Sequence, residues 1–404
     1  MLFGFGVFLF ALGIAISIAL HEAGHMWTAK ALGMKVRRYY IGFGPKIFSF
    51  RRGETEYGVK AIPAGGFCDI AGMTALDELA PDEVDRAMYK QKTWKRLVVM
   101  SGGIAMNFVL GIVLLFGLAV TWGLPNLDPR AVVDRVTCVP ATQAGESADY
   151  ALAPCEGTGP AGAAGIEPGD VVLAVNGQSV ESFSDLVVLT REVDGTAQFT
   201  IDRDGTELTL PVAVEQVQRW VVDPDTGEVS SATVGAIGIA APPRITEYNA
   251  LTAVPGTLVF TGELGVLTVK AVLDLPNKVS GLWTAVTGGE RDIETPVSVV
   301  GASVIGGQMA ERGIWQSFVL LLAQLNFFLG IFNLLPLLPL DGGHMAVAIY
   351  EKIRDWIRGL RGLPAGAPAN YMKLLPLTYA AIIVGGAFML LTLTADIVNP
   401  IQLF

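Results

Sequence analysis

Two histidines and a glutamate stand close together near the start of the chain, in His21-Glu22-Ala23-Gly24-His25. On an α-helix, residues four positions apart share a face, so His21 and His25 can bind one metal ion while Glu22 addresses a water molecule on it. Zinc suits two imidazole nitrogens plus an oxygen ligand. Zinc acidifies such a water and polarises a scissile carbonyl, and the glutamate accepts a proton and passes it to the leaving amine. The motif predicts a zinc peptidase.

The motif lies at the end of one of four apolar segments. The chain has 404 residues, of which 51% are apolar and only 16% charged. A membrane crossing takes roughly 20 apolar residues, and four segments qualify, at about residues 2 to 24, 97 to 122, 317 to 339 and 374 to 396. The first has no basic start and no cleavage site, so we expect a permanent span rather than a signal peptide. These segments predict an α-helical multi-pass membrane protein with four transmembrane helices.

Charge distribution predicts the topology. The net charge of −10 is concentrated in residues 125 to 250, whereas basic residues follow the first span (Lys30, Lys35, Arg37, Arg38, Arg51, Arg52, Lys92, Lys95 and Arg96) and the third (Lys352, Arg354, Arg358, Arg361 and Lys373). By the positive-inside rule, the two basic regions are cytoplasmic. Four crossings then place both termini and the acidic insert outside, and the motif lies towards the cytoplasmic side of the membrane.

Two histidines leave a zinc ion one protein ligand short. We expect Asp341 to supply it, because the third span ends just before it on the same side of the membrane as His25. A carboxylate at a proline-rich helix exit, followed by Gly342 and Gly343, can approach an ion closely. His344 is the one histidine outside the motif, and we expect it to contact the Asp341 loop or cap the turn rather than bind the metal.

Residues 36 to 70 lack helical periodicity. Aromatic and β-branched residues alternate around Gly53, a pattern that predicts hairpins. This segment is either a re-entrant β element that lines the active site or an ordinary cytoplasmic hairpin. A substrate helix must unwind before cleavage, and an exposed β edge could hold it as an added strand. We expect that edge within Phe43 to Phe67, with Gly65, Gly66 and Phe67 contacting the substrate.

The acidic insert reads as a separate domain. A Gly-Pro turn, a buried strand at Val171 to Val175 and the Asn176-Gly177 turn precede a helix from about Ser184 to Glu192. Two strand signals follow, around Asp204-Gly205. This order resembles a circularly permuted PDZ domain, so we expect an α+β PDZ-like domain over residues 125 to 245. Residues 1 to 124 and 316 to 404 would be the two halves of the membrane domain, with surface helices in 246 to 315.

Two of the three cysteines, Cys138 and Cys155, fall in the outer insert, where a disulfide can form. They are either bonded to each other or two small buried thiols. Cys68 falls on the cytoplasmic side, where no disulfide is expected.

The motifs together resemble the site-2 protease family. They are His-Glu-x-Gly-His in the first span, Leu340-Asp341-Gly342 after the third, Gly42-Phe43-Gly44-Pro45 and Pro63-Ala64-Gly65-Gly66-Phe67 between the first two spans, and the PDZ-like insert. Within that family, the chain looks like the actinobacterial regulators of intramembrane proteolysis with one PDZ domain. It departs from the family in the second span, where relatives often have Ala-Gly-Pro before an asparagine and this chain has Gly102-Gly103-Ile104-Ala105-Met106-Asn107. Here Gly102, Gly103 and Asn107 either pack near the site or make plain helix contacts.

The resemblance implies one zinc ion per chain, bound by His21, His25 and Asp341, with Glu22 as the catalytic base. It implies that Asn333, in the family's Asn-x-x-Pro position, helps to hold the substrate backbone; a helix-terminating role before Pro336 is the alternative. It further implies a bacterial plasma-membrane protease that cuts single-span regulatory proteins such as anti-sigma factors within or near their transmembrane segments.

Two other functions fit parts of the sequence. A transporter could use the histidines and Asp341 to move a metal ion or protons, and a membrane adaptor could carry the PDZ-like domain beside an inactive site. A complete set of ligands and base disfavours the adaptor. The acidic balance, with no basic stripe outside the membrane loops, argues against a nucleic-acid partner.

Overall fold

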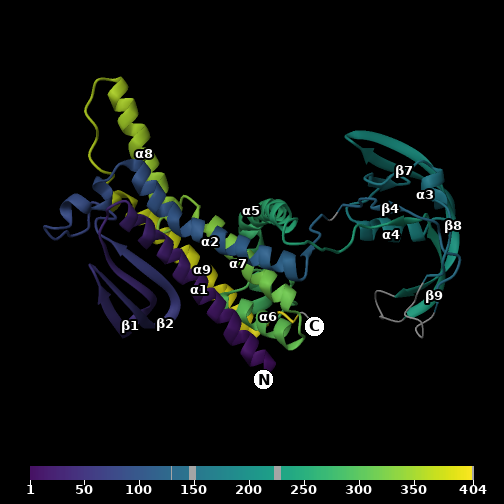
Figure 1. Ribbon diagram of the computed structural model, residues 1–404, viewed down its shortest axis with the longest axis horizontal. Coiled ribbons are helices and arrows are strands. Elements are labelled where there is room, and N and C mark those ends of the chain that lie inside the picture. The colour runs from purple at the N-terminus through teal and green to yellow at the C-terminus, as the bar shows by residue number, and fades with distance from the viewer. Residues whose placement is uncertain (129, 145–151, 223–228, 403–404) are drawn as a thin grey trace. The chain divides into compact units, whose positions relative to one another are not determined.

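The structure is a computed structural model that describes residues 1–128, 130–144, 152–222 and 229–402. It contains two compact units (Figure 1), one formed by Met1–Leu124 with Glu247–Phe404 and the other by Pro125–Thr246.

Four helices of the first unit are long and apolar enough to cross a membrane: α1 (Leu2–Ala31), α2 (Thr93–Thr121), α7 (Trp315–Asn333) and α9 (Tyr371–Val398). They correspond to the four predicted segments. However, α1 continues beyond the expected end, so the histidine motif lies within the helix. It stops where Gly33 takes a positive φ of 84° and the Met34 N–H donates to the Ala29 carbonyl at 2.9 Å, a common helix ending.

The third span ends earlier than predicted, and this changes the setting of Asp341. α7 ends at Asn333, residues 334 to 340 form turns, and Asp341 is the first residue of a further helix, α8 (Asp341–Leu360). Pro336 and Pro339 explain the early end, because proline lacks the N–H that a helix interior needs and clashes with the preceding turn. Asp341 therefore does not lie at a helix exit: it begins a helix, where an acidic side chain is favourable.

Helices α1 and α2 approach closely through glycines. A Cβ on Gly24 would clash with the Gly102 carbonyl, and one on Gly102 would lie 2.6 Å from the Gly24 carbonyl oxygen. Small residues permit such contact between spanning helices. α2 also packs against α7, so it is the common neighbour of both. α2 is unbroken from Thr93 to Thr121, in agreement with the absence of the proline that relatives often have before the asparagine of this span.

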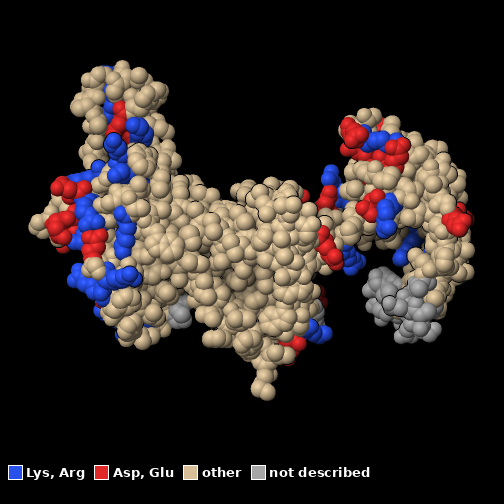
Figure 2. Space-filling model, in the orientation of Figure 1, with Lys and Arg blue, Asp and Glu red and all other residues tan. Residues whose placement is uncertain are grey.

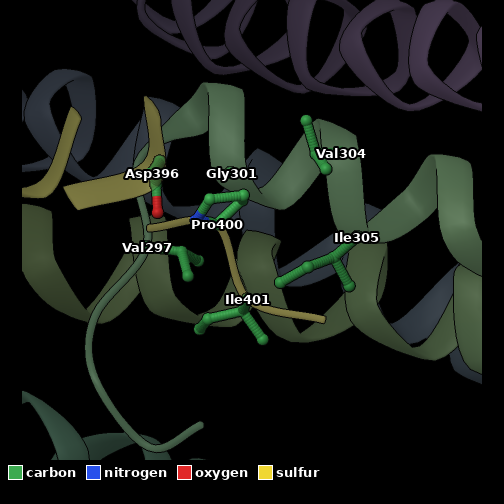
Figure 3. A pocket seen from close by; sticks show the side chains of 7 residues that line it. All are labelled: Val297, Gly301, Val304, Ile305, Asp396, Pro400 and Ile401. Atoms are coloured by element: carbon green, nitrogen blue, oxygen red, sulfur yellow. The ribbon is translucent and has the colours of Figure 1, made fainter. Parts of the chain in front are cut away.

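The connector between the units forms two helices, α5 (Ala253–Val286) and α6 (Val299–Glu311). They pack directly on the spans: α5 contacts α2, α7 and α9, and α6 contacts α1. A small cavity of about 10 Å³, close to the minimum for one water molecule, lies between α6 and the end of α9 (Figure 3) and is lined by Val297, Gly301, Val304, Ile305, Asp396, Pro400 and Ile401. None of the predicted site residues lines it.

Residues 36 to 70 form two long antiparallel strands, β1 (Val36–Arg52) and β2 (Thr55–Ile70), as the alternation predicts. Both strands bend. Residues 36–43 of β1 pair with residues 66–70 of β2 on one side and with residues 55–62 on the other, and residues 55–62 also pair with residues 46–52. Tyr39 pairs with both Tyr57 and Cys68, while Phe50 pairs with Tyr57. The pairing therefore builds a four-stranded sheet in the order 66–70, 36–43, 55–62, 46–52. The segment from 66 to 70 is an edge, because no strand in the described ranges pairs with its other side.

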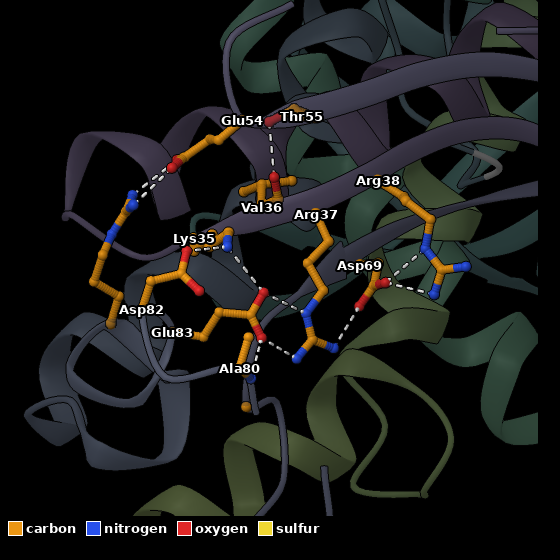
Figure 4. A network of polar contacts seen from close by, with 12 residues as sticks. Lys35, Val36, Arg37, Arg38, Glu54, Thr55, Asp69, Ala80, Asp82 and Glu83 are labelled. Carbon is orange, nitrogen blue, oxygen red and sulfur yellow. Dashed lines mark hydrogen bonds and ion pairs between the residues drawn. The ribbon is translucent and has the colours of Figure 1, made fainter. Parts of the chain in front are cut away.

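A network of charged side chains holds the base of this hairpin (Figure 4). Arg37 Nη2 lies 2.6 Å from Glu83 Oε2, Lys35 Nζ lies 3.1 Å from Glu83 Oε1, and Arg38 pairs with Asp69. The hydrogen bond from Arg37 lowers the pKa of the buried Glu83 carboxyl to about 2. Glu83 precedes the short helices η1 (Val84–Arg86) and η2 (Met88–Lys90), so the network joins the hairpin to the segment that leads into α2.

Among its described residues, the second unit has a five-stranded antiparallel sheet and two short helices. Its strand order is β6 (Gln178–Ser179), β5 (Val171–Val175), β7 (Gly195–Arg203), β8 (Thr206–Val222) and β9 (Val229–Ala236). The helices are α3 (Gly159–Ala163) and α4 (Phe183–Arg191). Two further sheets have two short strands each: β3 (Leu124–Pro125) pairs with β11 (Ile245–Thr246), and β4 (Arg135–Val136) pairs with β10 (Ile239–Ala240).

The turn, strand and helix signals of the insert are recovered in this order. Asn176 and Gly177 both have positive φ, at 50° and 79°, as their two-residue hairpin turn requires. Phe199 and Ile201 are fully buried in the core of this unit. Cys138 and Cys155 are joined by a disulfide, and Cys68 is a free thiol.

Candidate metal centre

Three predicted ligands meet within the first unit. His21 Nε2 and His25 Nε2 each lie 3.2 Å from Asp341 Oδ2, and the two nitrogens are 3.2 Å apart. The three side chains are only 7% to 13% exposed. Residues separated by more than 300 positions in the sequence are thus brought into one triangle at the start of α8.

This triangle fits a zinc ion. Ligand atoms about 2.0 to 2.1 Å from a tetrahedral zinc lie about 3.3 Å from one another, close to the three spacings observed. Asp341 Oδ2 is buried and lacks a hydrogen-bond partner among the described residues, although a buried carboxylate oxygen normally has one. A metal ion would satisfy it.

Each histidine is oriented by a contact on its other ring nitrogen. His25 Nδ1 lies 2.8 Å from the carbonyl oxygen of Val99 in α2. A carbonyl can only accept, so Nδ1 carries the proton and Nε2 keeps its lone pair for a metal. The orientation of His25 is thus fixed by the backbone of the neighbouring helix.

Asn107 provides the matching contact for His21. Its Nδ2 lies 3.1 Å from His21 Nδ1, while its Oδ1 is buried with no partner among the described residues. For His21 Nε2 to bind a metal, Nδ1 must donate, and the partner must then be Oδ1. A half-turn of the amide makes that bond and also gives the orphaned oxygen a donor, so Asn107 suits the metal-bound site.

Gly103 provides the space for both imidazoles. A Cβ at this position would overlap His25 Nε2 and lie 2.8 Å from His21 Nε2. The sequence left open whether Gly102, Gly103 and Asn107 pack near the site or make plain helix contacts. Gly102 makes a helix contact, whereas Gly103 and Asn107 lie at the site.

Glu22 lies beside the histidines and against the edge strand of the hairpin. The Glu22 carboxylate lies near the backbone N–H of Cys68, and a Cβ on Gly66 would lie 3.2 Å from Glu22 Cγ. Gly66 therefore leaves the room that the glutamate occupies. The sequence motif names Glu22, but the backbone beside it comes from β2.

Asp341 is held through its helix. Glu351, ten residues further along α8, forms a buried ion pair with Arg96 in the first turns of α2, and its other oxygen accepts from the Ala369 N–H at 2.6 Å. α2 also supplies the Val99 carbonyl that orients His25. Sequence reasoning did not predict this pair, because nothing in the sequence distinguishes Glu351 from the other charged residues of α8, such as Lys352 and Asp355.

The other predicted site residues lie outside the ligand triangle. Asn333 ends α7 and donates from Nδ2 to the Leu329 carbonyl at 3.0 Å. Gly65, Gly66 and Phe67 lie on β2, where Phe67 pairs with Tyr40. His344 stacks on Tyr371 and lies outside the ligand triangle.

The fold and site define a class: a membrane metallopeptidase, with a His-Glu-x-x-His motif in a helix apolar enough to span a membrane and an aspartate from a distant helix that completes a possible metal site. The sequence profile of peptidase family M50 matches residues 9–377. The protein named zinc metalloprotease Rip1 of Mycobacterium bovis is 53% identical over the full length of both chains, and its namesake in Mycobacterium tuberculosis is 52% identical. The metalloprotease MmpA of Caulobacter vibrioides is 28% identical and covers 85% of each chain.

This chain belongs to peptidase family M50, the family of site-2 proteases. The predicted resemblance, the zinc cofactor and the metalloprotease activity are confirmed. Membership in this family decides between the peptidase and the transporter in favour of the peptidase.

Proposed function

We propose that this protein is an intramembrane zinc endopeptidase that cuts single-span regulatory membrane proteins, such as anti-sigma factors, within or near their transmembrane segments. The observation that carries this proposal is the position of His21, Glu22 and His25 inside α1, a helix apolar enough to span a membrane. A peptidase site there can reach only substrates that are themselves within the bilayer or at its surface.

The residues divide the work of hydrolysis. His21, His25 and Asp341 would hold the zinc ion, which supplies a Lewis acid for the scissile carbonyl and acidifies the attacking water. Glu22 accepts the proton of that water as its oxygen adds to the acyl carbon. It then gives the proton to the amine as the C–N bond breaks. Val99 and Asn107 keep the two imidazoles in the tautomer that binds metal.

The edge strand at residues 66 to 70 is a suitable place for the substrate backbone. It has a free side among the described strands and contacts Glu22 through Cys68 and Gly66. A substrate segment added to this edge would lie beside the catalytic glutamate in the extended form that cleavage needs. We assign Gly65, Gly66 and Phe67 to this contact, and Asn333 to a second contact with the substrate backbone.

We further propose that the site faces the cytoplasmic side of a bacterial plasma membrane and that residues 125 to 245 form an extracytoplasmic PDZ-like domain. Lys and Arg side chains gather at the end of the first unit that carries α8 and the hairpin, while the apolar helices are nearly free of charge (Figure 2). That distribution supports the proposed side under the positive-inside rule. The disulfide in the insert suits an oxidising compartment.

Replacing Glu22 tests the proposed mechanism. We expect Glu22→Gln to abolish cleavage of a single-span substrate in detergent or liposomes while the purified protein keeps about one zinc per chain, because the ligands are unchanged. Mass spectrometry of the products would locate the scissile bond. Undiminished cleavage by Glu22→Gln, or a scissile bond far outside the substrate's membrane segment, would contradict the proposal.

A further inference from the structure

A groove separate from the metal centre lies between α1 and the hairpin. It has a volume of about 420 Å³ and is lined by Met26, Trp27, Lys30, Phe50, Arg52, Gly53 and Tyr57. None of these residues belongs to the ligand triangle. Its lining combines two cations with three aromatic rings and a methionine.

The two cations keep unused hydrogen-bond donors. Lys30 Nζ donates to the Tyr57 hydroxyl at 2.7 Å and lies 5.1 Å from the centre of that ring, which uses one of its three N–H groups. Within the described ranges, Arg52 forms no ion pair or hydrogen bond through its side chain. By contrast, Glu54, two residues further on, is bound by Arg86. The groove thus holds two positive charges and has no carboxylate among its lining residues.

An apolar surface leads away from these cations. Phe48, Phe50 and Arg52 alternate along one strand and so share a face, and the ring centroids of Phe48 and Phe50 are 5.9 Å apart. Phe48 is 59% exposed, and Phe50 and Trp27 are each 51% exposed. On α1, the exposed side chains Ile16 and Trp27 lie eleven residues apart, close to three full turns, and therefore on the same side of the helix.

We infer that this groove binds an anionic phospholipid, with the phosphate between Lys30 and Arg52 and the acyl chains along Phe50, Phe48 and Trp27. Tryptophan and tyrosine favour the level of lipid headgroups, and basic side chains there attract anionic lipids. In the topology proposed above, this end of α1 lies at the cytoplasmic leaflet. A polar acidic peptide would satisfy the cations but would leave the exposed aromatic row in water.

Arg52 offers a sharp test because Arg51 is a matched control. The two arginines are adjacent, both are exposed, and they point to opposite faces of β1, so only Arg52 lines the groove. Native mass spectrometry of the full-length protein in a neutral detergent would measure binding of added phosphatidylglycerol and phosphatidylcholine. We expect tighter binding of phosphatidylglycerol, weakened about fivefold by Arg52→Gln and unchanged by Arg51→Gln. Lys30→Gln should weaken it similarly.

Three results would overturn the inference: equal binding of the two lipids, equal loss in the Arg51 and Arg52 variants, or displacement of the lipid by a soluble acidic peptide. Zinc content and cleavage of a single-span substrate in detergent separate this question from the proposed function. A variant that loses lipid preference but keeps its zinc and its cleavage supports the lipid site. If the unmodified enzyme does not cleave the substrate, that result would count against the proposed function and not against the lipid site.

Discussion

At the metal centre, each imidazole depends on a residue of α2 that the histidine motif does not contain. Val99 supplies a backbone carbonyl to His25, Asn107 a side-chain amide to His21, and Gly103 the absence of a side chain next to both rings. Metal affinity at this site is therefore a property of the pair of helices, and residues outside the triangle should change it.

Gly103→Ala should lower zinc occupancy. The added methyl group would overlap His25 Nε2, and the crossing of α1 and α2 at Gly24 and Gly102 leaves little room for either helix to move. We expect zinc per chain, measured by atomic emission, to fall well below one, with cleavage falling in proportion. Gly117→Ala in the same helix is the control, since a Cβ there meets nothing within 4 Å. Full zinc in Gly103→Ala would contradict this account.

Among single residues, type and spacing were enough to predict the cluster of possible metal ligands. His21 and His25 follow from helical periodicity, and Asp341 from the shared side of two spans; the role of Glu22 stays a prediction. The role of Val99 could not be predicted, because a backbone carbonyl carries no residue-type signal. The N–H of Cys68 that lies near Glu22 likewise belongs to the backbone.

At the scale of elements, α8 connects the metal site to the rest of the first unit. It begins with the ligand Asp341 and is tied to α2 by the buried pair of Arg96 and Glu351. Breaking one partner of a buried ion pair leaves an uncompensated charge and usually costs several kcal/mol. The pair should therefore act on the metal through the position of α8.

Glu351→Gln should weaken zinc binding without removing any ligand. Loss of outer contacts around a metal site typically costs 10- to 100-fold in affinity, and we expect a change of about that size in a competition titration with a chelator. The visible spectrum of the cobalt-substituted protein should also change if Asp341 shifts. As a control, Glu290→Gln alters a carboxylate in the turn after α5 and should leave both measurements unchanged. Unaltered affinity and spectrum in Glu351→Gln would show that the pair only stabilises the fold.

The hairpin base should respond to pH through Glu83. Its pKa in the folded protein, about 2, lies below the ordinary value of 4.5 because Arg37 stabilises the ionised form. The stabilisation is therefore present above about pH 4.5 and is lost as pH falls towards 2. Hydrogen exchange in residues 80 to 90, corrected for the intrinsic rate, should show protection falling at least about tenfold across that range. Glu83→Gln should lower protection at pH 7 and flatten the dependence; an unchanged profile would argue against the assigned role.

The sequence predicted the presence of helices and strands better than it predicted their ends and their pairing. The four spans were predictable because a bilayer demands a long apolar run. The hairpin was predictable from its alternation, but its double pairing was not, because alternation alone does not show which stretches of two long strands face one another. The early end of α7 was signalled by Pro336 and Pro339, yet the apolar residues between them favoured a longer span.

At the scale of the whole molecule, the membrane unit is interrupted by a separate folded insert, and we propose that the insert excludes substrates with large outer domains. Its sheet and buried core are complete within residues 125 to 246. A unit with its own core can be removed or replaced without disturbing the ligand triangle. The metal site and the control of substrate access should therefore be separable.

Replacing residues 126 to 245 with a short Gly-Ser linker should broaden substrate choice. We expect the shortened protein to retain about one zinc per chain and to cut single-span proteins that still carry their outer domains, which the full-length enzyme spares. Co-expression with tagged substrates, with and without their outer domains, would measure the change. Unchanged selectivity with full zinc occupancy would refute the gating role.

The positions of the predicted ligands in the sequence also determine the order in which they are synthesised. Ribosomal synthesis delivers His21 and His25 first and Asp341 only after the insert and three further helices, α5, α6 and α7, have been made. A nascent chain therefore carries two exposed imidazoles and a base in the membrane with an incomplete metal site throughout most of its synthesis. Under the proposed function, proteolysis becomes possible only once α8 has been made, after the insert that we propose as the gate.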